Sequence, residues 1–123
     1  MEKIIQTEKA AAAIGPYSQG VCVANLLFTS GQIPISPKTG EVPEGIEAQT
    51  VQVMENLKAV AEAAGTELKK AVKTTCYLND MSDFNQFNAI YANYFSEKPA
   101  RSCVAVKALP KGVLVEVEAV IEI

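Results

Sequence analysis

The chain has 123 residues, a net charge of −3 and no histidine. We expect a single domain over residues 1–123, because this length is ordinary for one domain. A hydrophobic content of 49% excludes a disordered chain. The pI of about 5.0 and the lack of a basic run argue against binding to nucleic acid. A mean hydropathy of +0.12 favours an oligomer, because a small monomer leaves much of its surface exposed.

The absence of histidine and the spacing of the cysteines limit the kinds of catalytic and metal site that the chain can form. Without histidine the chain has no Ser–His or Cys–His nucleophile pair and no imidazole base, and most kinds of zinc site are excluded. The three cysteines, Cys22, Cys76 and Cys103, lack close spacing, so we expect free thiols and a reducing cytoplasm. The N-terminal ten residues lack the apolar core of a signal peptide, and no stretch has the length of a membrane span.

The first third of the chain predicts β-structure. A short apolar run covers residues 3–7, and residues 20–31 hold two apolar stretches around a tight turn at Ala24-Asn25. Loops marked by glycine and proline cover residues 10–20 and 34–45.

From residue 46 onward the pattern changes to helical spacing. Apolar residues recur over 46–64, and Gly65 stands where a helix C-terminal cap belongs. Residues 71–78 alternate as a strand. A second helix is predicted to begin near Ser82 and Asp83, either of which is a suitable cap. Its apolar face carries Phe84, Phe87, Tyr91, Tyr94 and Phe95.

Two strands close the chain, at 100–106 and 113–123, joined by turn residues 110–112. The resulting order is β-β-β-α-β-α-β-β. Crossover connections are right-handed, so we expect an α+β fold with a mixed six-stranded sheet and both helices on one face. The other face of the sheet is then open to other subunits. The predicted core side of the last strand carries Val113, Val115, Val117, Ala119 and Ile121.

The strand at 100–106 directs two reactive groups to the same side. Side chains along a strand alternate, so Arg101 and Cys103 share one side and Ser102 lies on the other. If residues 110–112 close a simple hairpin, Glu118 falls within about two positions of Cys103 on the neighbouring strand. The hypothesis is a cluster of Arg101, Cys103 and Glu118.

Each of these groups also has a purely structural interpretation. Arg101 fits a solvated charge or an ion pair, Cys103 a small buried hydrophobe, and Glu118 a solvated sheet face. Tyr17 fits a loop anchor, and Asn88 fits a residue that caps a turn.

Several motifs together resemble the RidA branch of the Rid (YjgF) family, the reactive intermediate deaminases. They are "GPYSQG" at 15–20, "TSGQIP" at 29–34, "TGEVP" at 39–43, "NLKAVAEAAG" at 56–65, "PARSCV" at 99–104 and "LPKGVLVEVEAV" at 109–120. The resemblance runs through the chain in order and without large gaps. It implies a chorismate-mutase-like fold and a homotrimer, with sheets around a central barrel and sites in clefts between subunits.

The resemblance also implies an activity. The family hydrolyses reactive 2-imino acids, which are tautomers of enamines such as 2-aminoacrylate, to 2-oxo acids and ammonia, and thereby protects pyridoxal-phosphate enzymes. We therefore expect a hydrolase of C=N bonds that acts on 2-iminobutanoate and 2-iminopropanoate, with no metal or cofactor. The partner is a small-molecule substrate, with neither nucleic acid nor membrane involved.

Site residues follow from the same motifs. The resemblance makes Arg101 the carboxylate-binding residue, and its planar guanidinium suits bidentate binding. Glu118 corresponds to the carboxylate that positions water. The remaining pocket positions are Cys103, Tyr17, Ser30, Gly31 and Asn88.

Other functions remain open at this stage. A regulatory protein that binds small carboxylates without turnover uses the same cleft. A ribonuclease or translation inhibitor is disfavoured by the acidic pI and the absent histidine. The sequence is silent on a chaperone-like role of exposed apolar surface.

Overall fold

The computed structural model describes residues 3–123. It contains the predicted element order, with three short 3-10 turns between the longer elements. The strands are β1 (Lys3–Ile5), β2 (Gly20–Val23), β3 (Leu26–Thr29), β4 (Ala71–Leu78), β5 (Ala100–Ala105) and β6 (Val115–Glu122). The helices are α1 (Ile46–Ala63) and α2 (Phe84–Tyr94), and the 3-10 turns are Leu68–Lys70, Met81–Asp83 and Pro110–Gly112.

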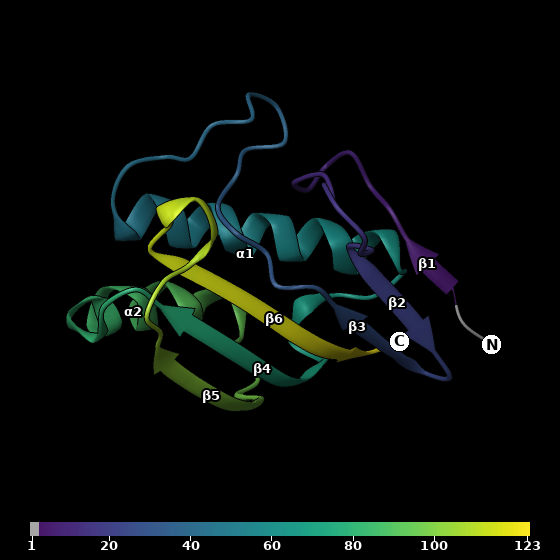
Figure 1. Cartoon of the computed structure of the whole chain (residues 1–123). Coiled ribbons are helices and arrows are strands. Elements are labelled where there is room, and N and C mark those ends of the chain that lie inside the picture. Colours follow the sequence, from purple (N-terminus) through teal and green to yellow (C-terminus); the bar gives the residue numbers. More distant parts are fainter. Residues whose placement is uncertain (1–2) are drawn as a thin grey trace.

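All six strands form one mixed sheet in the order β1-β2-β3-β6-β4-β5 (Figure 1). Every neighbouring pair is antiparallel except β4 and β5, which run parallel. The sequence-based hairpin between the last two strands is therefore wrong. The crossover through α2 returns β5 parallel to β4 at the edge of the sheet, so β6 pairs with the other side of β4.

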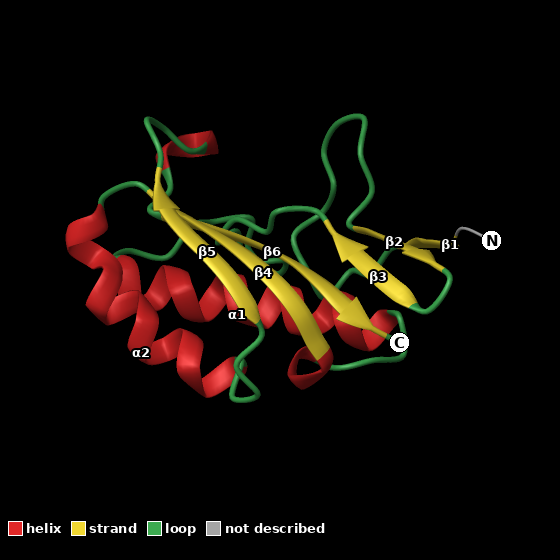
Figure 2. Ribbon diagram, turned by 90° about the horizontal axis from the view of Figure 1, so that it is seen from below, coloured by secondary structure: helices red, strands yellow, loops and turns green. Residues whose placement is uncertain are grey.

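Both helices cover the same face of the sheet, as predicted (Figure 2). Helix α1 contacts α2 and β6, and the core lies between this helical layer and the sheet. The five residues predicted for the inner side of the last strand are all buried, at exposures of 0–3%. Apolar residues at helical spacing meet apolar residues at strand spacing in one hydrophobic cluster.

Two helix boundaries depend on local backbone chemistry. Helix α1 ends near Gly65, whose φ of +82° lies in the left-handed region that terminates helices. The predicted cap of the second helix is different in detail. The carboxylate of Asp80, rather than a side chain of Ser82 or Asp83, accepts a hydrogen bond from the backbone N–H of Ser82 at 2.8 Å.

The second face of the sheet has no helix on it. Its β1–β3 half is apolar, with Ile4, Val23 and Phe28 exposed by 68%, 40% and 44%. Its β4–β6 half carries mainly polar side chains, among them Glu116 and Glu118. No helix of residues 3–123 is long and apolar enough to cross a membrane.

Candidate functional site

Arg101 points from β5 toward helix α2. Its Nη1 donates a hydrogen bond of 2.7 Å to Oδ1 of Asn88. Its guanidinium carbon lies 4.7 Å from the ring centroid of Tyr91 and 5.5 Å from that of Phe84. Because all three partners belong to α2, this helix holds the guanidinium in one orientation. The cationic group is thus fixed before any ligand arrives.

Arg101 is the only arginine of the chain. It is half-buried, and within residues 3–123 no carboxylate forms an ion pair with it. The single ion pair of that range joins Lys69 and Glu67 at 4.0 Å on the surface. A half-buried cation without a counter-charge favours an anionic ligand, since burial of an unpaired charge is unfavourable.

Cys103 lies on the same side of β5 as Arg101, as the alternation predicts. It pairs in register with Cys76 of β4. Burial raises the pKa of Cys76 to about 12, and a nearby Cys103 thiolate acts in the same direction. Burial also raises the pKa of Cys103, although the positive charge of Arg101 opposes this. Neither thiol is thus prepared as a nucleophile at neutral pH.

Glu118 does not join Arg101 and Cys103. It pairs with Thr75 of β4, whereas Arg101 pairs with Thr74, so the two charged side chains project from opposite faces of the sheet. Oε1 of Glu118 accepts a hydrogen bond of 3.2 Å from the hydroxyl of Tyr77. The predicted three-residue cluster is therefore absent from a single chain, because β4 separates the two strands.

A second group of predicted residues meets elsewhere. Tyr17, Ser30 and Gly31 line a cavity of about 510 Å³, together with parts of the segments 11–14 and 32–35 and the turn 110–111. The carboxylate in this cavity belongs to Glu116, a residue that the sequence analysis did not select. The alternating pattern of the last strand places Glu116 on the same face as Glu118. This pattern alone does not show which of the two glutamates lines the cavity.

Glu116 is close to Gly31 and half-buried. A Cβ built on Gly31 would lie 2.1 Å from Oε2 of Glu116, so the carboxylate occupies space that only glycine leaves free. Burial raises the pKa of Glu116, and the negative charge of Glu118 raises it further. A carboxylate with a raised pKa in a cavity has the character of a proton-transfer group.

Buried amide side chains fix the walls of this cavity. Nδ2 of Asn56 on α1 donates hydrogen bonds to the carbonyl oxygens of Ile33 and Ile35, at 3.2 and 3.0 Å. Oε1 of Gln49, on the same helix, accepts a hydrogen bond of 2.8 Å from the N–H of Leu114, next to the 110–112 turn. These bonds satisfy backbone groups that lie outside regular strands and thereby hold the walls in place.

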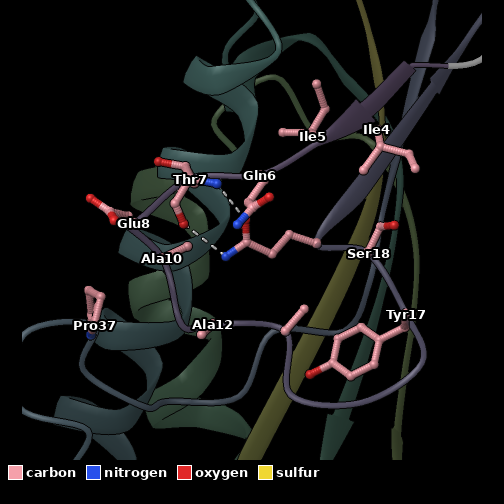
Figure 3. A pocket seen from close by; sticks show the side chains of 12 residues that line it. Ile4, Ile5, Gln6, Thr7, Glu8, Ala10, Ala12, Tyr17, Ser18 and Pro37 are labelled. Carbon is pink, nitrogen blue, oxygen red and sulfur yellow. Dashed lines mark hydrogen bonds between the residues drawn. The ribbon is translucent and has the colours of Figure 1, made fainter.

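Gln19 fastens the loop that carries Tyr17. Its amide nitrogen donates to the carbonyl oxygens of Thr7 and Ala11, at 3.0 and 2.7 Å, and its Oε1 accepts from the N–H of Thr7 at 2.7 Å. Figure 3 marks the two bonds that involve Thr7 as dashed lines. A cavity of about 660 Å³ lies along this loop and also touches Tyr17. Among residues 3–123, no lysine or arginine lines it.

Arg101 and Asn88 line a separate cavity of about 310 Å³ between α2 and the start of β5. One chain thus presents two partial sites, one with the guanidinium and one with the Glu116 carboxylate. Among residues 3–123, no group of three His, Cys, Asp or Glu side chains is arranged to hold a metal ion.

Comparison with known proteins finds relatives that match nearly the whole chain. Residues 7–123 match the family model described as Endoribonuclease L-PSP. The chain is 52% identical to the 2-iminobutanoate/2-iminopropanoate deaminase of Escherichia coli K12, over 98% of this chain and 97% of that protein. The crystal structure of RidA from the Antarctic bacterium Psychrobacter sp. PAMC 21119 matches with a TM-score of 0.95 and 48% identity, over 98% of this chain and 99% of that one.

The structure of E. coli TdcF with bound serine also matches, with a TM-score of 0.95 and 44% identity over 98% of both chains. The family model covers nearly the whole chain, and the sequence identities far exceed those of chance structural similarity. The chain therefore belongs to the Endoribonuclease L-PSP family, the family of YjgF and the Rid proteins.

Proposed function

We propose that this chain hydrolyses small 2-imino acids to 2-oxo acids and ammonia, with Arg101 binding the substrate carboxylate. The observation that carries the proposal is the guanidinium itself, which is half-buried, held by α2 and without an acidic partner in residues 3–123. Similarity to a deaminase of 2-iminobutanoate and 2-iminopropanoate supports this reaction. The serine bound by TdcF supports a ligand with the size and carboxylate of a small amino acid.

The complete site requires a second copy of the chain. Arg101 and Glu116 project from opposite faces of the sheet, so one chain does not place both around a small ligand. The face without helices is partly apolar and suits contact with other copies. These two features support a homotrimer with sites between subunits, which is the assembly that the sequence resemblance implies.

In this site the chain's own groups supply binding and water activation. Arg101 binds the carboxylate, while Gly31 and Ser30 line the part of the site beside Glu116. The exposed Tyr17 covers the ligand, and Asn88 holds the Nη1 edge of the guanidinium in place. Cys103 lies two residues beyond Arg101 and borders the ligand as an apolar group.

We assign the water-positioning role to Glu116 rather than Glu118. Glu116 lines the cavity with Tyr17 and Gly31, whereas Glu118 accepts a hydrogen bond from Tyr77 outside the residues of that cavity. The ionised Glu116 takes a proton from water as the oxygen attacks C2 of the protonated imine. Glu116 then passes this proton to the nitrogen, and it takes the proton of the new hydroxyl group as the C–N bond breaks, so that ammonia leaves and the 2-oxo acid forms.

The barrier is modest, because a protonated imine is already electrophilic and no cofactor chemistry enters the reaction. Orientation of water and substrate supplies much of the rate. A charge-assisted pair between Arg101 and the carboxylate contributes roughly 1.5–3 kcal/mol. Its loss lowers kcat/KM by at least about tenfold.

The test compares wild type with Arg101→Ala. An amino-acid oxidase supplies 2-iminobutanoate, and formation of 2-oxobutanoate and ammonia is followed over the uncatalysed rate. We expect acceleration by wild type, a loss of at least about tenfold in Arg101→Ala, and full activity in Lys69→Ala, which removes an exposed surface cation. An unchanged kcat/KM in a correctly assembled Arg101→Ala protein would overturn the assignment of Arg101.

Phenylglyoxal offers a second test, because it modifies guanidinium groups and this chain has only one. We expect 2-oxobutanoate to protect Arg101 from modification. Protection and binding without any turnover would instead indicate a regulatory protein that binds small carboxylates. Cleavage of RNA is not part of the proposal, because the chain is acidic and has no histidine.

A further inference from the structure

Two aromatic rings contact the Arg101 guanidinium, and the ring of Tyr91 is the nearer one. Its ring centroid is 4.7 Å from the guanidinium carbon, compared with 5.5 Å for Phe84. The ring itself is buried and stacks on Phe95 at a centroid distance of 4.8 Å. The guanidinium therefore rests on a ring that the core already holds in place.

The hydroxyl of Tyr91 is tied to the strand next to Arg101. It shares a buried hydrogen bond of 2.7 Å with Oγ1 of Thr74. Thr74 is also the residue of β4 that pairs in register with Arg101 of β5. Three contacts thus link the same three residues. The backbone of Arg101 is paired with Thr74, Thr74 is hydrogen-bonded to Tyr91, and the ring of Tyr91 contacts the Arg101 guanidinium.

These contacts restrain the side chain of Arg101, which otherwise has many rotamers. A long arginine loses considerable conformational entropy when it is held in one orientation. Arg101 loses this conformational entropy when the chain folds. A carboxylate ligand therefore does not have to order the guanidinium when it binds. Asn88 occupies Nη1, and the other N–H groups remain for a bidentate pair with a ligand.

We propose that Tyr91, anchored by Thr74, is a positioning residue that sets the orientation of the Arg101 guanidinium for the substrate carboxylate. The inference rests on the proposed function, since it assigns the role of Tyr91 in the same site. Loss of the Tyr91 ring weakens carboxylate binding and raises KM, while the bond-breaking steps at C2 continue through Glu116 and kcat changes little.

The first experiment observes the guanidinium directly. Because Arg101 is the only arginine, protein labelled with ¹⁵N-arginine shows a single Nε–Hε signal in an NMR spectrum. We expect this signal to be displaced by the ring current of Tyr91 in wild type. In Tyr91→Leu it moves toward its position in the unfolded chain. The matched control is Phe87→Leu, which removes another buried ring that neighbours Tyr91, at 5.7 Å between centroids, and leaves the signal in place.

The second experiment separates binding from turnover. With 2-iminobutanoate as substrate, we expect Tyr91→Leu to raise KM by about fivefold, in proportion to a lost cation–π contact, with kcat within about twofold. Phe87→Leu lowers Tm but keeps KM within about twofold of wild type. A purely structural role of Tyr91 would give both variants the same KM and the same Arg101 signal, and that result would overturn the inference.

The anchor is tested by Tyr91→Phe and Thr74→Val, which retain the core volume and keep the proposal testable if Tyr91→Leu does not fold. We expect each to raise KM by about twofold to threefold, and the double variant to show no further increase, because both remove the same bond. Additive effects would overturn the anchoring role. The NMR signal does not depend on turnover, so a chain inactive toward imines refutes the proposed function, while the signal still decides the role of Tyr91.

Discussion

Gly31 lies against the carboxylate of Glu116, and the two residues share one small volume. A Cβ on Gly31 would stand 2.1 Å from Oε2 and 2.8 Å from Cδ of Glu116, far inside van der Waals contact. The backbone of Gly31 is not in the left-handed region, so the requirement for glycine is one of space rather than of backbone conformation. The absence of one side chain thus determines where the proposed water-activating carboxylate stands.

Gly31→Ala should therefore displace the Glu116 carboxylate without unfolding the chain, because the end of a glutamate side chain can rotate away. We expect kcat/KM for 2-iminobutanoate to fall by at least about tenfold, while Tm changes by only a few degrees. In a Glu116→Gln background the same substitution should have little further effect. A fully active Gly31→Ala protein would contradict the role of Glu116.

Glu116 and Glu118 are distinguished by their pH profiles. Glu116→Gln should lower kcat by 10²-fold or more, within the range typical of a lost general base. Glu118→Gln should keep a comparable kcat at pH 8 but change the acid side of the profile. The negative charge of Glu118 raises the pKa of Glu116, so its removal lowers that pKa, and Glu116 stays ionised to lower pH.

The measurement is kcat/KM from pH 5 to pH 8 with 2-iminobutanoate. The acid limb of Glu118→Gln should lie at lower pH than that of wild type. If Glu118→Gln abolishes turnover while Glu116→Gln retains it, the assignment based on the sequence resemblance is right and the one based on the cavity is wrong.

The cysteines should differ in reactivity toward alkylating reagents. Cys76 is fully buried with a pKa of about 12, so it should remain unmodified by iodoacetamide at pH 8. Cys103 is only half-buried and lies near the positive charge of Arg101, so it should react first, and faster as the pH rises. Peptide mass analysis after timed quenching measures both. Faster alkylation of Cys76 than of Cys103 would contradict the burial of Cys76 between the sheet and the helices.

Asn56 should contribute more to the free energy of unfolding than an exposed polar residue of α1. Asn56→Leu keeps most of the volume but leaves the carbonyl oxygens of Ile33 and Ile35 without their donor. We expect a loss of about 1–3 kcal/mol in the free energy of unfolding, measured by urea denaturation. Lys58→Ala, an exposed change on the same helix, should stay within about 0.5 kcal/mol of wild type. Equal stability of the two variants would show that the cavity wall does not depend on Asn56.

Much of the fold was predictable because local patterns specify it. Alternation in 71–78 and 113–123 predicted two strands, and apolar residues at helical spacing predicted α1 from residue 46 to its end beside Gly65. The turn at Ala24-Asn25 was likewise correct, with Ala24 at a φ of +53°. The placement of both helices on one face followed from the handedness of crossover connections. The side shared by Arg101 and Cys103 followed from the period of two.

The order of the strands was a different matter, since pairing between strands depends on contacts far apart in the sequence. The turn at 110–112 looks like a hairpin locally, yet β4 lies between β5 and β6 because the α2 crossover brings β5 to the edge. That insertion separates Arg101 from Glu118 by one strand, and the register places them on opposite faces, because Arg101 pairs with Thr74 and Glu118 with Thr75. The carboxylate beside Gly31 is that of Glu116.

Local patterns in the sequence are enough to predict the helices and strands, the family resemblance and the residue types available for chemistry. Those features depend on residues near one another in the chain and on their periodicity. The folded chain is needed to show which carboxylate faces the cavity, which ring contacts the Arg101 guanidinium, and that one chain holds two partial sites. These depend on strand order and on distances between side chains, which no local pattern encodes.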